Sequence, residues 1–392
     1  MKIVVAPDKF KGSLPAAQVA AAIAAGLRSG LARAGCPAAE LVTIPVADGG
    51  EGTVDAAVAA GFERVPVTAA GPAGDPVRSG YARRGEVAVV ELAGACGLAR
   101  LPGGPCSPRA APLTASSFGA GELLRAALES GARRIVLGVG GSASTDGGAG
   151  LLQALGTRVL GAGGELAAPM GGGALRDVTA LDLTGLHAAL HGAEIILAAD
   201  VANPLTGPDG AAEVYGPQKG ASPAEVAVLA AGLRRWAAVV AATIGTDWSQ
   251  VPGAGAAGGV GFAALAVLGA TRRPGIELVL DLADFETALD GADLVITGEG
   301  SLDTQSLAGK TPVGVARAAG RHGIDVVAVA GRSTLTAAEL GAAGIAAVYP
   351  LGDLEPDLER CRAEAASLLH LVGQMIARDR LAEAVTKAET RA

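Results

Sequence analysis

The sequence predicts an α/β protein with a largely parallel sheet, because short runs of β-branched residues alternate with alanine-rich stretches of helical length. The short runs are apolar throughout, which is typical of strands that are buried on both faces of a sheet. The chain has 392 residues, enough for about two domains. Half of the residues are hydrophobic but only 3% are aromatic, so we expect cores built from Ala, Val, Leu and Ile.

The expected strands are the buried runs at residues 2–6, 41–47, 133–139, 194–199, 293–297 and 325–330. The expected helices are the alanine-rich stretches at residues 15–29, 51–60, 118–130, 147–155, 223–243, 311–322 and 357–378. Ser13 before Pro15 and Ser222 before Pro223 are typical helix starts, because serine caps a first turn and proline fits its first position.

The character of the sequence changes between about residues 66 and 115, where turns follow one another at short intervals and an antiparallel segment is expected. We therefore expect a Rossmann-like domain made of residues 1–66 and 280–392. A second α/β domain, residues 67–279, is expected to be inserted into it. The stretch 116–155 could belong to either domain.

The overall charge bears on the class of partner. The formal net charge is −8, and this argues against nucleic acid, which calls for a basic face. The N-terminus shows no signal peptide, because its apolar run is short and meets Asp8 at once. Residues 249–271 carry no charge over a membrane-spanning length, but their glycine-rich first half favours a loop that leads into a buried helix. We expect no membrane partner.

The cysteines indicate the cellular compartment. The four cysteines (Cys36, Cys96, Cys106 and Cys361) form no C-x-x-C pair, and we expect reduced thiols in a cytoplasmic protein.

Glycine-rich motifs follow the expected strands. "PDKFKGS", "ADGGEGT", "GGSASTDGG", "ADVANPLTG" and "GEGSLD" each lie at or just past the carboxyl end of a strand. In open α/β sheets this edge is where ligands bind. A structural protein could place a few turn residues there by chance, but five such motifs indicate a site.

The lysines and carboxylates of these motifs indicate the chemistry. Only six residues are lysine, and four of them lie in glycine-rich segments: Lys9, Lys11, Lys219 and Lys310. They could be exposed loop residues, but lysine in such places is typical of a grip on phosphate or carboxylate. The five motifs at the strand ends contain seven acids: Asp8, Asp48, Glu51, Asp146, Asp200, Glu299 and Asp303. This mixture favours a magnesium–nucleotide site over a hydrolase for neutral substrates.

Two familiar signatures nearly fit. "GEGSLDTQSLAGKT" ends like a P-loop, but Thr304 stands where that motif needs glycine. "GVGGSA" matches the G-x-G-x-x-A dinucleotide fingerprint, and the acid expected about twenty residues later would be Glu165. A nicotinamide-dependent oxidoreductase therefore remains an alternative.

Six motifs, in order along nearly the whole chain, resemble the bacterial type-1 glycerate kinase family: "APDKFKGSL" (6–14), "ADGGEGT" (47–53), "GGSASTDGG" (140–148), "DVANPLTG" (200–207), "GPQKGA" (216–221) and "GEGSLDTQSLAGKTPVGVA" (298–316). The resemblance implies phosphorylation of D-glycerate with ATP and Mg²⁺ in the cytoplasm, most often giving 2-phosphoglycerate. It also implies a Rossmann-like domain with a second α/β domain inserted, and an active site in the cleft between the two.

We assign hypothetical roles on this basis. Asp200 is the first candidate for the base that takes the hydroxyl proton, and Asp303 is the second. Lys219 and Lys310 would balance charge on the phosphates. The candidate substrate ligands are Asp8, Lys11, Ser13 and Asn203, and the candidate phosphate ligands are the backbone and hydroxyls of Gly140, Gly141, Ser142 and Ser144. The candidate metal ligands are Asp48, Glu51 and Asp146.

Each carboxylate also has a structural interpretation. Asp200 could hold a turn, Asp146 could cap the helix that follows it, and Asp48 or Glu51 could cap the next helix. The acceptor could also be the 3-hydroxyl or another small hydroxy-acid, and a non-catalytic anion-binding protein is a third class. The sequence leaves the oligomeric state, including a homo-oligomer, open.

Overall fold

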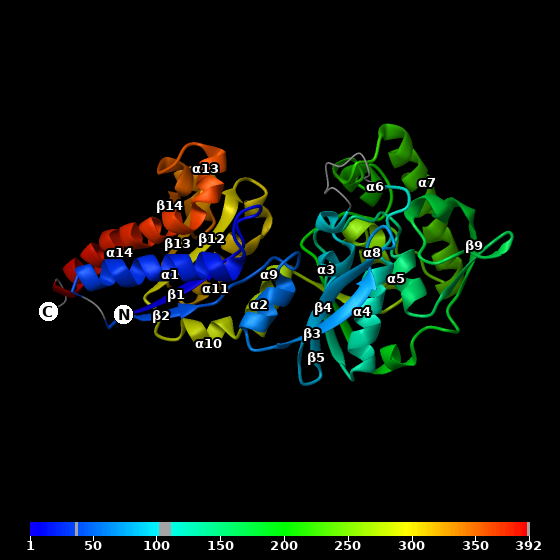
Figure 1. Ribbon diagram of the computed structural model, residues 1–392, viewed down its shortest axis with the longest axis horizontal. Coiled ribbons are helices and arrows are strands. Elements are labelled where there is room, and N and C mark those ends of the chain that lie inside the picture. Colours follow the sequence, from blue (N-terminus) through cyan, green and yellow to red (C-terminus); the bar gives the residue numbers. More distant parts are fainter. Residues whose placement is uncertain (36–37, 102–110, 390–392) are drawn as a thin grey trace. The chain divides into compact units, whose positions relative to one another are not determined.

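The computed structural model describes residues 1–35, 38–101 and 111–389. The chain forms two compact units, Met1–Asp48 with Val279–Ala392 (unit 1) and Gly49–Leu278 (unit 2) (Figure 1). Each unit has its own sheet and its own hydrophobic core. The predicted α/β class with mostly parallel sheets is confirmed.

The boundary between the units lies after Asp48, whereas the sequence placed the domain boundary after residue 66. Residues 49–66 lie in unit 2 because helix α2 (Thr53–Ala59) packs on strands of that unit and strand β3 (Glu63–Ala70) pairs with one of them. The stretch 116–155, which the sequence left open, also lies in unit 2.

The sheet of unit 1 is parallel throughout, in the order β14-β13-β12-β1-β2. Its strands are β1 (Lys2–Pro7), β2 (Glu40–Thr43), β12 (Leu294–Leu302), β13 (Val326–Ser333) and β14 (Ala347–Pro350). The chain runs from β1 outward to β2, and after unit 2 it continues on the other side of β1 with β12, β13 and β14. The strand order therefore reverses between β1 and β12, and in such sheets the crevice at this reversal is where ligands bind.

The helices of unit 1 cover this sheet. They are α1 (Ala16–Arg33), α10 (Phe285–Leu289), α11 (Thr311–Arg321), α12 (Ala337–Ala342), α13 (Leu358–Ala363) and α14 (Ala365–Glu389). Helices α1 and α14 lie side by side (Figure 1). They approach closely at Gly26, where an added Cβ would lie 2.0 Å from the carbonyl oxygen of His370. The helix expected at 357–378 is two helices, which meet at Glu364.

The main sheet of unit 2 has the order β11-β10-β6-β5-β4-β3. Its other strands are β4 (Pro76–Arg84), β5 (Val87–Glu91), β6 (Arg134–Gly138), β10 (Glu194–Ala198) and β11 (Thr271–Arg273). Strands β3, β4 and β5 are antiparallel, which confirms the antiparallel segment, and β5, β6, β10 and β11 are parallel. A small separate sheet contains β7 (Arg158–Gly161), β8 (Gly164–Glu165) and β9 (Val178–Asp182).

The other helices of unit 2 are α3 (Leu92–Cys96), α4 (Phe118–Glu129), α5 (Ala149–Ala154), α6 (Ala211–Tyr215), α7 (Pro223–Ile244) and α8 (Ala256–Ala266). Helix α9 (Gly275–Leu282) contains the boundary between the units. The uncharged stretch 249–271 contains the short buried helix α8, as expected.

Within the described chain, α7 is the one helix long and apolar enough, by length and composition, to cross a membrane. One face of α7, including Leu233 and Trp236, belongs to the hydrophobic core of unit 2. Core helices of soluble proteins share this length and composition. Of the four cysteines, Cys96 and Cys361 are free and buried. Cys36 and Cys106 lie outside the described residues.

Candidate active site

Two acidic residues flank the strand reversal of unit 1. The last register pair of β1 and β12 is Pro7 with Gly298, and Asp8 and Glu299 follow directly on the two strands. The Asp8 backbone N–H donates to the Gly298 carbonyl at 2.8 Å, which continues the ladder by one bond. Both acids therefore lie at the edge of the sheet where a ligand is expected.

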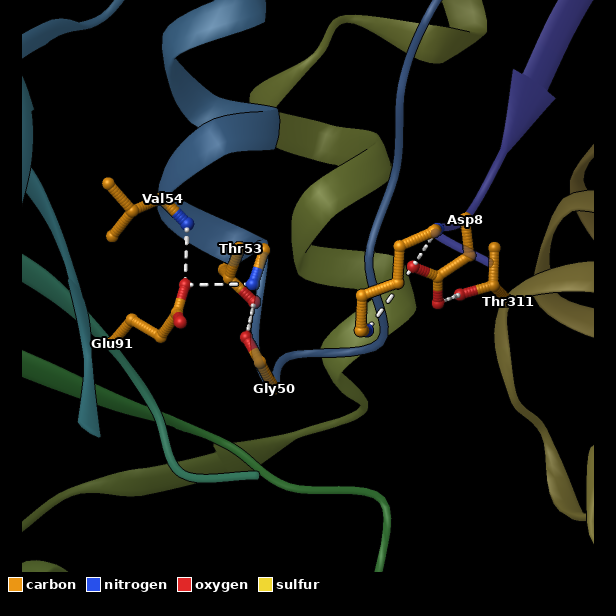
Figure 2. A network of polar contacts seen from close by, with 8 residues as sticks. Asp8, Gly50, Thr53, Val54, Glu91 and Thr311 are labelled. Carbon is orange, nitrogen blue, oxygen red and sulfur yellow. Dashed lines mark hydrogen bonds and ion pairs between the residues drawn. The ribbon is translucent and has the colours of Figure 1, made fainter. Parts of the chain in front are cut away.

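Asp8 is buried, with 5% of its surface exposed, and its carboxylate is held on both sides. One oxygen accepts the Lys9 backbone N–H at 2.6 Å and lies 3.4 Å from the Lys9 ammonium. The other accepts the hydroxyl of Thr311, the first residue of α11, at 3.0 Å (Figure 2). Burial raises the pKa of Asp8, the charge of Asp48 raises it further, and Lys9 and Thr311 oppose the rise.

Glu299 has a strongly perturbed carboxylate at the same edge. Burial raises its pKa to about 7, and the charges of Asp8 and Asp48 act in the same direction. A hydrogen bond from Ser306 and the charge of Lys310 oppose the rise. The Oε1 atom of Glu299 is buried and has no hydrogen-bond partner among the described residues. The sequence marked Glu299 only as one of several acids at strand ends and gave it no role.

The other candidate site residues of unit 1 make contacts that stabilise turns and loops, or are exposed. Asp303 accepts the Gln305 backbone N–H at 2.9 Å and lies 3.4 Å from the Ser301 hydroxyl, an arrangement typical of a turn. Ser13 donates its hydroxyl to the Arg362 carbonyl at 2.7 Å and so links its loop to α13. Lys11 is exposed, and Lys310 is the N-cap residue of α11.

In unit 2 a buried lysine holds the glycine-rich loop that follows β6. Lys219 is 4% exposed, and its Nζ donates to the Ser142 hydroxyl at 2.8 Å and to the Ser144 carbonyl at 2.5 Å. Burial lowers the pKa of Lys219 to about 7, while Asp146 raises it. The structure thus brings Lys219, Ser142 and Ser144 together, with the ammonium bonded to the loop itself.

Several glycines of this loop are required by close packing. An added Cβ on Gly140 would lie 2.6 Å from the Gly50 Cα, and one on Gly147 would lie 2.5 Å from the Trp236 ring. Gly148 has a φ of +73° and meets the Ala263 Cβ at 2.4 Å. Gly141, with φ +77°, has more space, since its nearest neighbour is the Ala93 Cβ at 3.5 Å. Approach to a ligand is therefore not the reason for most of these glycines.

Asp146 caps the start of a helix. It is fully buried, and its carboxylate accepts both the backbone N–H and the hydroxyl of Ser117 at 2.7 Å. It also accepts the N–H groups of Gly148 at 3.2 Å and Gly150 at 3.4 Å, at the start of α5. This is the structural alternative that the sequence offered. Both oxygens are used by the protein itself, so we remove Asp146 from the candidate metal ligands.

Asp200 and Glu91, at the ends of β10 and β5, also bind helix N-termini. Asp200 accepts the N–H of Gly275, the first residue of α9, at 2.8 Å. Glu91 accepts the N–H groups of Gly52 at 3.0 Å and Val54 at 3.1 Å, at the start of α2 (Figure 2). The carboxylate at this end of α2 is therefore Glu91, and neither Asp48 nor Glu51 is needed as its cap.

Asn203 holds its own loop. Its side-chain oxygen accepts the Tyr215 hydroxyl at 2.6 Å, and its amide donates to the Asp209 carbonyl at 2.9 Å. This arrangement fixes the conformation of the "NPLTG" segment.

No group of three His, Cys, Asp or Glu side chains that could hold a metal exists in the described part of the chain. Asp48 belongs to unit 1 and Glu51 to unit 2. Glu165, which a dinucleotide fingerprint would require as a ribose ligand, lies on the small strand β8 and pairs with Arg158 at 2.8 Å. Its position does not support the oxidoreductase alternative.

Comparisons with known proteins agree on one family. The profile of the "Glycerate kinase family" matches residues 3–381. "Glycerate kinase" of Bacillus subtilis is 41% identical over 380 residues, which cover 96% of this chain and 97% of the relative. "Glycerate 2-kinase" of Escherichia coli K12 is 44% identical over 353 residues, covering 89% and 90%. A solved structure described as "Crystal structure of putative glycerate kinase 2 from Salmonella typhimurium LT2" matches with a TM-score of 0.81 at 40% identity, and the match covers both chains completely.

Proposed function

This chain belongs to the glycerate kinase family and is a small-molecule kinase, and from that premise we propose that it transfers the γ-phosphoryl group of ATP to the 2-hydroxyl of D-glycerate, giving 2-phosphoglycerate and ADP. The name of the Escherichia coli relative supports the 2-hydroxyl as the acceptor. The proposal places the reaction in the cytoplasm, the compartment that supplies ATP.

The main support for ATP as the phosphate donor is the pair of hydrogen bonds that Lys219 donates to Ser142 and Ser144. This contact fixes a glycine-rich loop at the carboxyl end of a parallel strand, where backbone N–H groups can bind phosphate oxygens. Catalysis of phosphoryl transfer depends mainly on such positioning and on neutralisation of charge. We assign the phosphates of ATP to residues 140–144.

The charges of unit 1 suit the acceptor. D-Glycerate has a carboxylate and two hydroxyls, so its site needs a cation and hydrogen-bond acceptors. Lys11 is the proposed cation for the carboxylate, and Asp8 and Asp303 are proposed acceptors at the same sheet edge. Lys310 keeps the proposed role of balancing phosphate charge. Ser13 contributes by holding its loop to α13.

The residues present are compatible with Mg²⁺. This ion usually keeps several waters and binds one or two carboxylates together with substrate phosphates, so it does not need a cage of three protein ligands. Asp48 and Glu51 are the alternative candidates for such a carboxylate ligand. When bound, Mg²⁺ would neutralise charge on the transferring phosphates.

The test is an assay of ADP release by the purified chain with D-glycerate or L-glycerate, with and without Mg²⁺, followed by phosphorus NMR of the product. We expect Mg²⁺-dependent ADP release with D-glycerate and a 2-phosphoglycerate signal. A 3-phosphoglycerate signal would overturn the assigned hydroxyl, and ADP release that does not respond to D-glycerate would overturn the function.

A further inference from the structure

Glu299 is half-buried, and its carboxylate differs in what it binds from the carboxylates that hold helix starts. Glu91, Asp146 and Asp200 each accept backbone N–H groups near the start of a helix. Glu299 accepts a hydrogen bond from Ser306, but its Oε1 is buried and has no partner in the described part of the chain. A buried oxygen left unsatisfied costs about 1–3 kcal/mol, so this oxygen is a candidate acceptor for a hydrogen bond from a bound ligand.

The place of Glu299 in the sheet favours a ligand as that explanation. Glu299 lies on β12, one residue past the last β1–β12 pair, and therefore at the reversal of strand order. Its partner on β13 is Ala330, a small buried residue that offers no polar group from its side chain. The crevice outside the strand ends at this reversal is where ligands of such sheets bind.

The charged groups around Glu299 come from each neighbouring segment. Asp8, paired with Lys9, follows β1, Asp48 lies in the loop after β2, and Lys310 precedes α11. Burial and the two aspartates favour the neutral acid, whereas Lys310 and Ser306 favour the carboxylate. The balance leaves the pKa at about 7, the range in which a carboxylic group both accepts and releases protons readily at neutral pH.

We propose that Glu299 is the catalytic residue that accepts the proton of the acceptor hydroxyl during phosphoryl transfer. This inference rests on the proposed function. As the hydroxyl O–H bond breaks, the proton moves to Oε1 of Glu299. The hydroxyl oxygen forms a bond to the γ-phosphorus of ATP, the bond from that phosphorus to the β–γ bridging oxygen breaks, and the electron pair stays on ADP. The proton then returns from Glu299 to solvent.

The two acids that the sequence favoured fit this role less well. Asp200 uses Oδ1 to hold the start of α9, and Asp303 has both oxygens close to turn donors. Glu299, in contrast, has a buried oxygen that is unsatisfied among the described residues.

The first test is Glu299→Gln in the full chain, a change that keeps size and removes the proton-accepting charge. We expect kcat to fall by about 10²–10⁴-fold, the usual effect of losing a general base, with the KM for ATP within threefold of wild type. Glu359→Gln, an exposed acid on α13, is the matched control and should keep the wild-type kcat. A Glu299→Gln kcat within threefold of wild type would overturn the inference.

A second measurement needs no variant and remains decisive if Glu299→Gln does not fold. The pH profile of kcat/KM for wild type should fall about tenfold per pH unit below an apparent pKa near 7, because protonated Glu299 cannot accept a proton. A flat profile between about pH 5.5 and 8 would overturn the inference.

The results of these two tests can be distinguished from a failure of the proposed function. If the product is 3-phosphoglycerate or another phosphorylated hydroxy-acid, the assigned substrate fails, and the same comparisons are made on that reaction. If wild type phosphorylates no hydroxy-acid at all, the proposed function and this inference both fail.

Discussion

Lys219 donates a hydrogen bond of 2.8 Å to the hydroxyl of Ser142, across 77 residues of sequence. The lysine is buried and reaches the loop after β6 from the short turn that follows α6. This contact helps to hold the loop that we assign to the phosphates of ATP in its conformation.

Replacing Lys219 by methionine should weaken ATP use and leave acceptor binding largely intact. Hydrogen bonds to charged groups contribute about 1.5–3 kcal/mol, which corresponds to about a 10–150-fold loss in kcat/KM for ATP. Steady-state kinetics with varied ATP measure this. Lys2→Met, which removes a half-buried lysine of β1 that donates to the Asp290 carbonyl, is the control. Equal kcat/KM in Lys219→Met and wild type would refute the role of Lys219.

The buried ammonium of Lys219 should also make stability depend on pH. Burial lowers its pKa from 10.5 to about 7, so between these values the unfolded chain binds a proton that the folded chain does not. The free energy of unfolding should therefore rise with pH from about 7 to 10.5 in wild type relative to Lys219→Met. Urea unfolding of both proteins at pH 7 and pH 9 measures the difference. If the free energy of unfolding changed equally with pH in the two proteins, the burial of the Lys219 ammonium would be contradicted.

Gly258 packs against the same loop and should not tolerate a side chain. Its φ is +67°, and an added Cβ would lie 2.1 Å from the Ser144 carbonyl oxygen. Gly258→Ala should lower the free energy of unfolding by about 2–4 kcal/mol, the sum of left-handed strain and overpacking. Gly245→Ala is a matched control, because Gly245 has a φ of +81° but nothing within 4 Å of its Cβ, and it should lose only about 1–2 kcal/mol. Equal losses in the two variants would show that packing on the loop is unimportant.

Asp146→Ala tests whether this buried acid has a structural role. Removing it leaves the donors of Ser117, Gly148 and Gly150 without their acceptor, and unfolding should become easier by about 3 kcal/mol or more. Asp177→Ala, at an exposed position, should change stability by less than about 0.5 kcal/mol. Chemical denaturation compares them. A stable Asp146→Ala protein with altered Mg²⁺ dependence would restore Asp146 as a metal ligand.

The apolar runs predicted strands β1, β6, β10, β12 and β13 well, because burial on both faces leaves a continuous pattern in the sequence. The strand expected at 41–47 is shorter, since β2 ends at Thr43. Pro45 has no N–H for the ladder, although the N–H groups of Ile44 and Val46 still donate to carbonyls of β1 and its end. The sequence did not predict β14, whose four residues lie at the sheet edge and are only partly buried.

The roles of single acids were harder to predict than their positions at strand ends. Asp146 and Ser117 are 29 residues apart, and Glu91 and Gly52 are 39 apart. Local sequence therefore gives no sign of which acid caps which helix. Glu299 was visible as an acid at a strand end, but its burial and its unsatisfied oxygen follow from the packing of β1, β12 and α11. Only the three-dimensional structure separates it from Asp200 and Asp303.

We assign the phosphates of ATP to backbone N–H groups of the loop 140–144, a set that excludes Ala143 because its N–H donates to the Cys96 carbonyl at 2.9 Å. Hydrogen–deuterium exchange of the full chain, with and without a non-hydrolysable ATP analogue and Mg²⁺, measures these groups directly. We predict slower exchange in a peptide covering residues 140–144 when the analogue binds. Unchanged exchange there, with saturating analogue and slower exchange at another loop, would contradict the account.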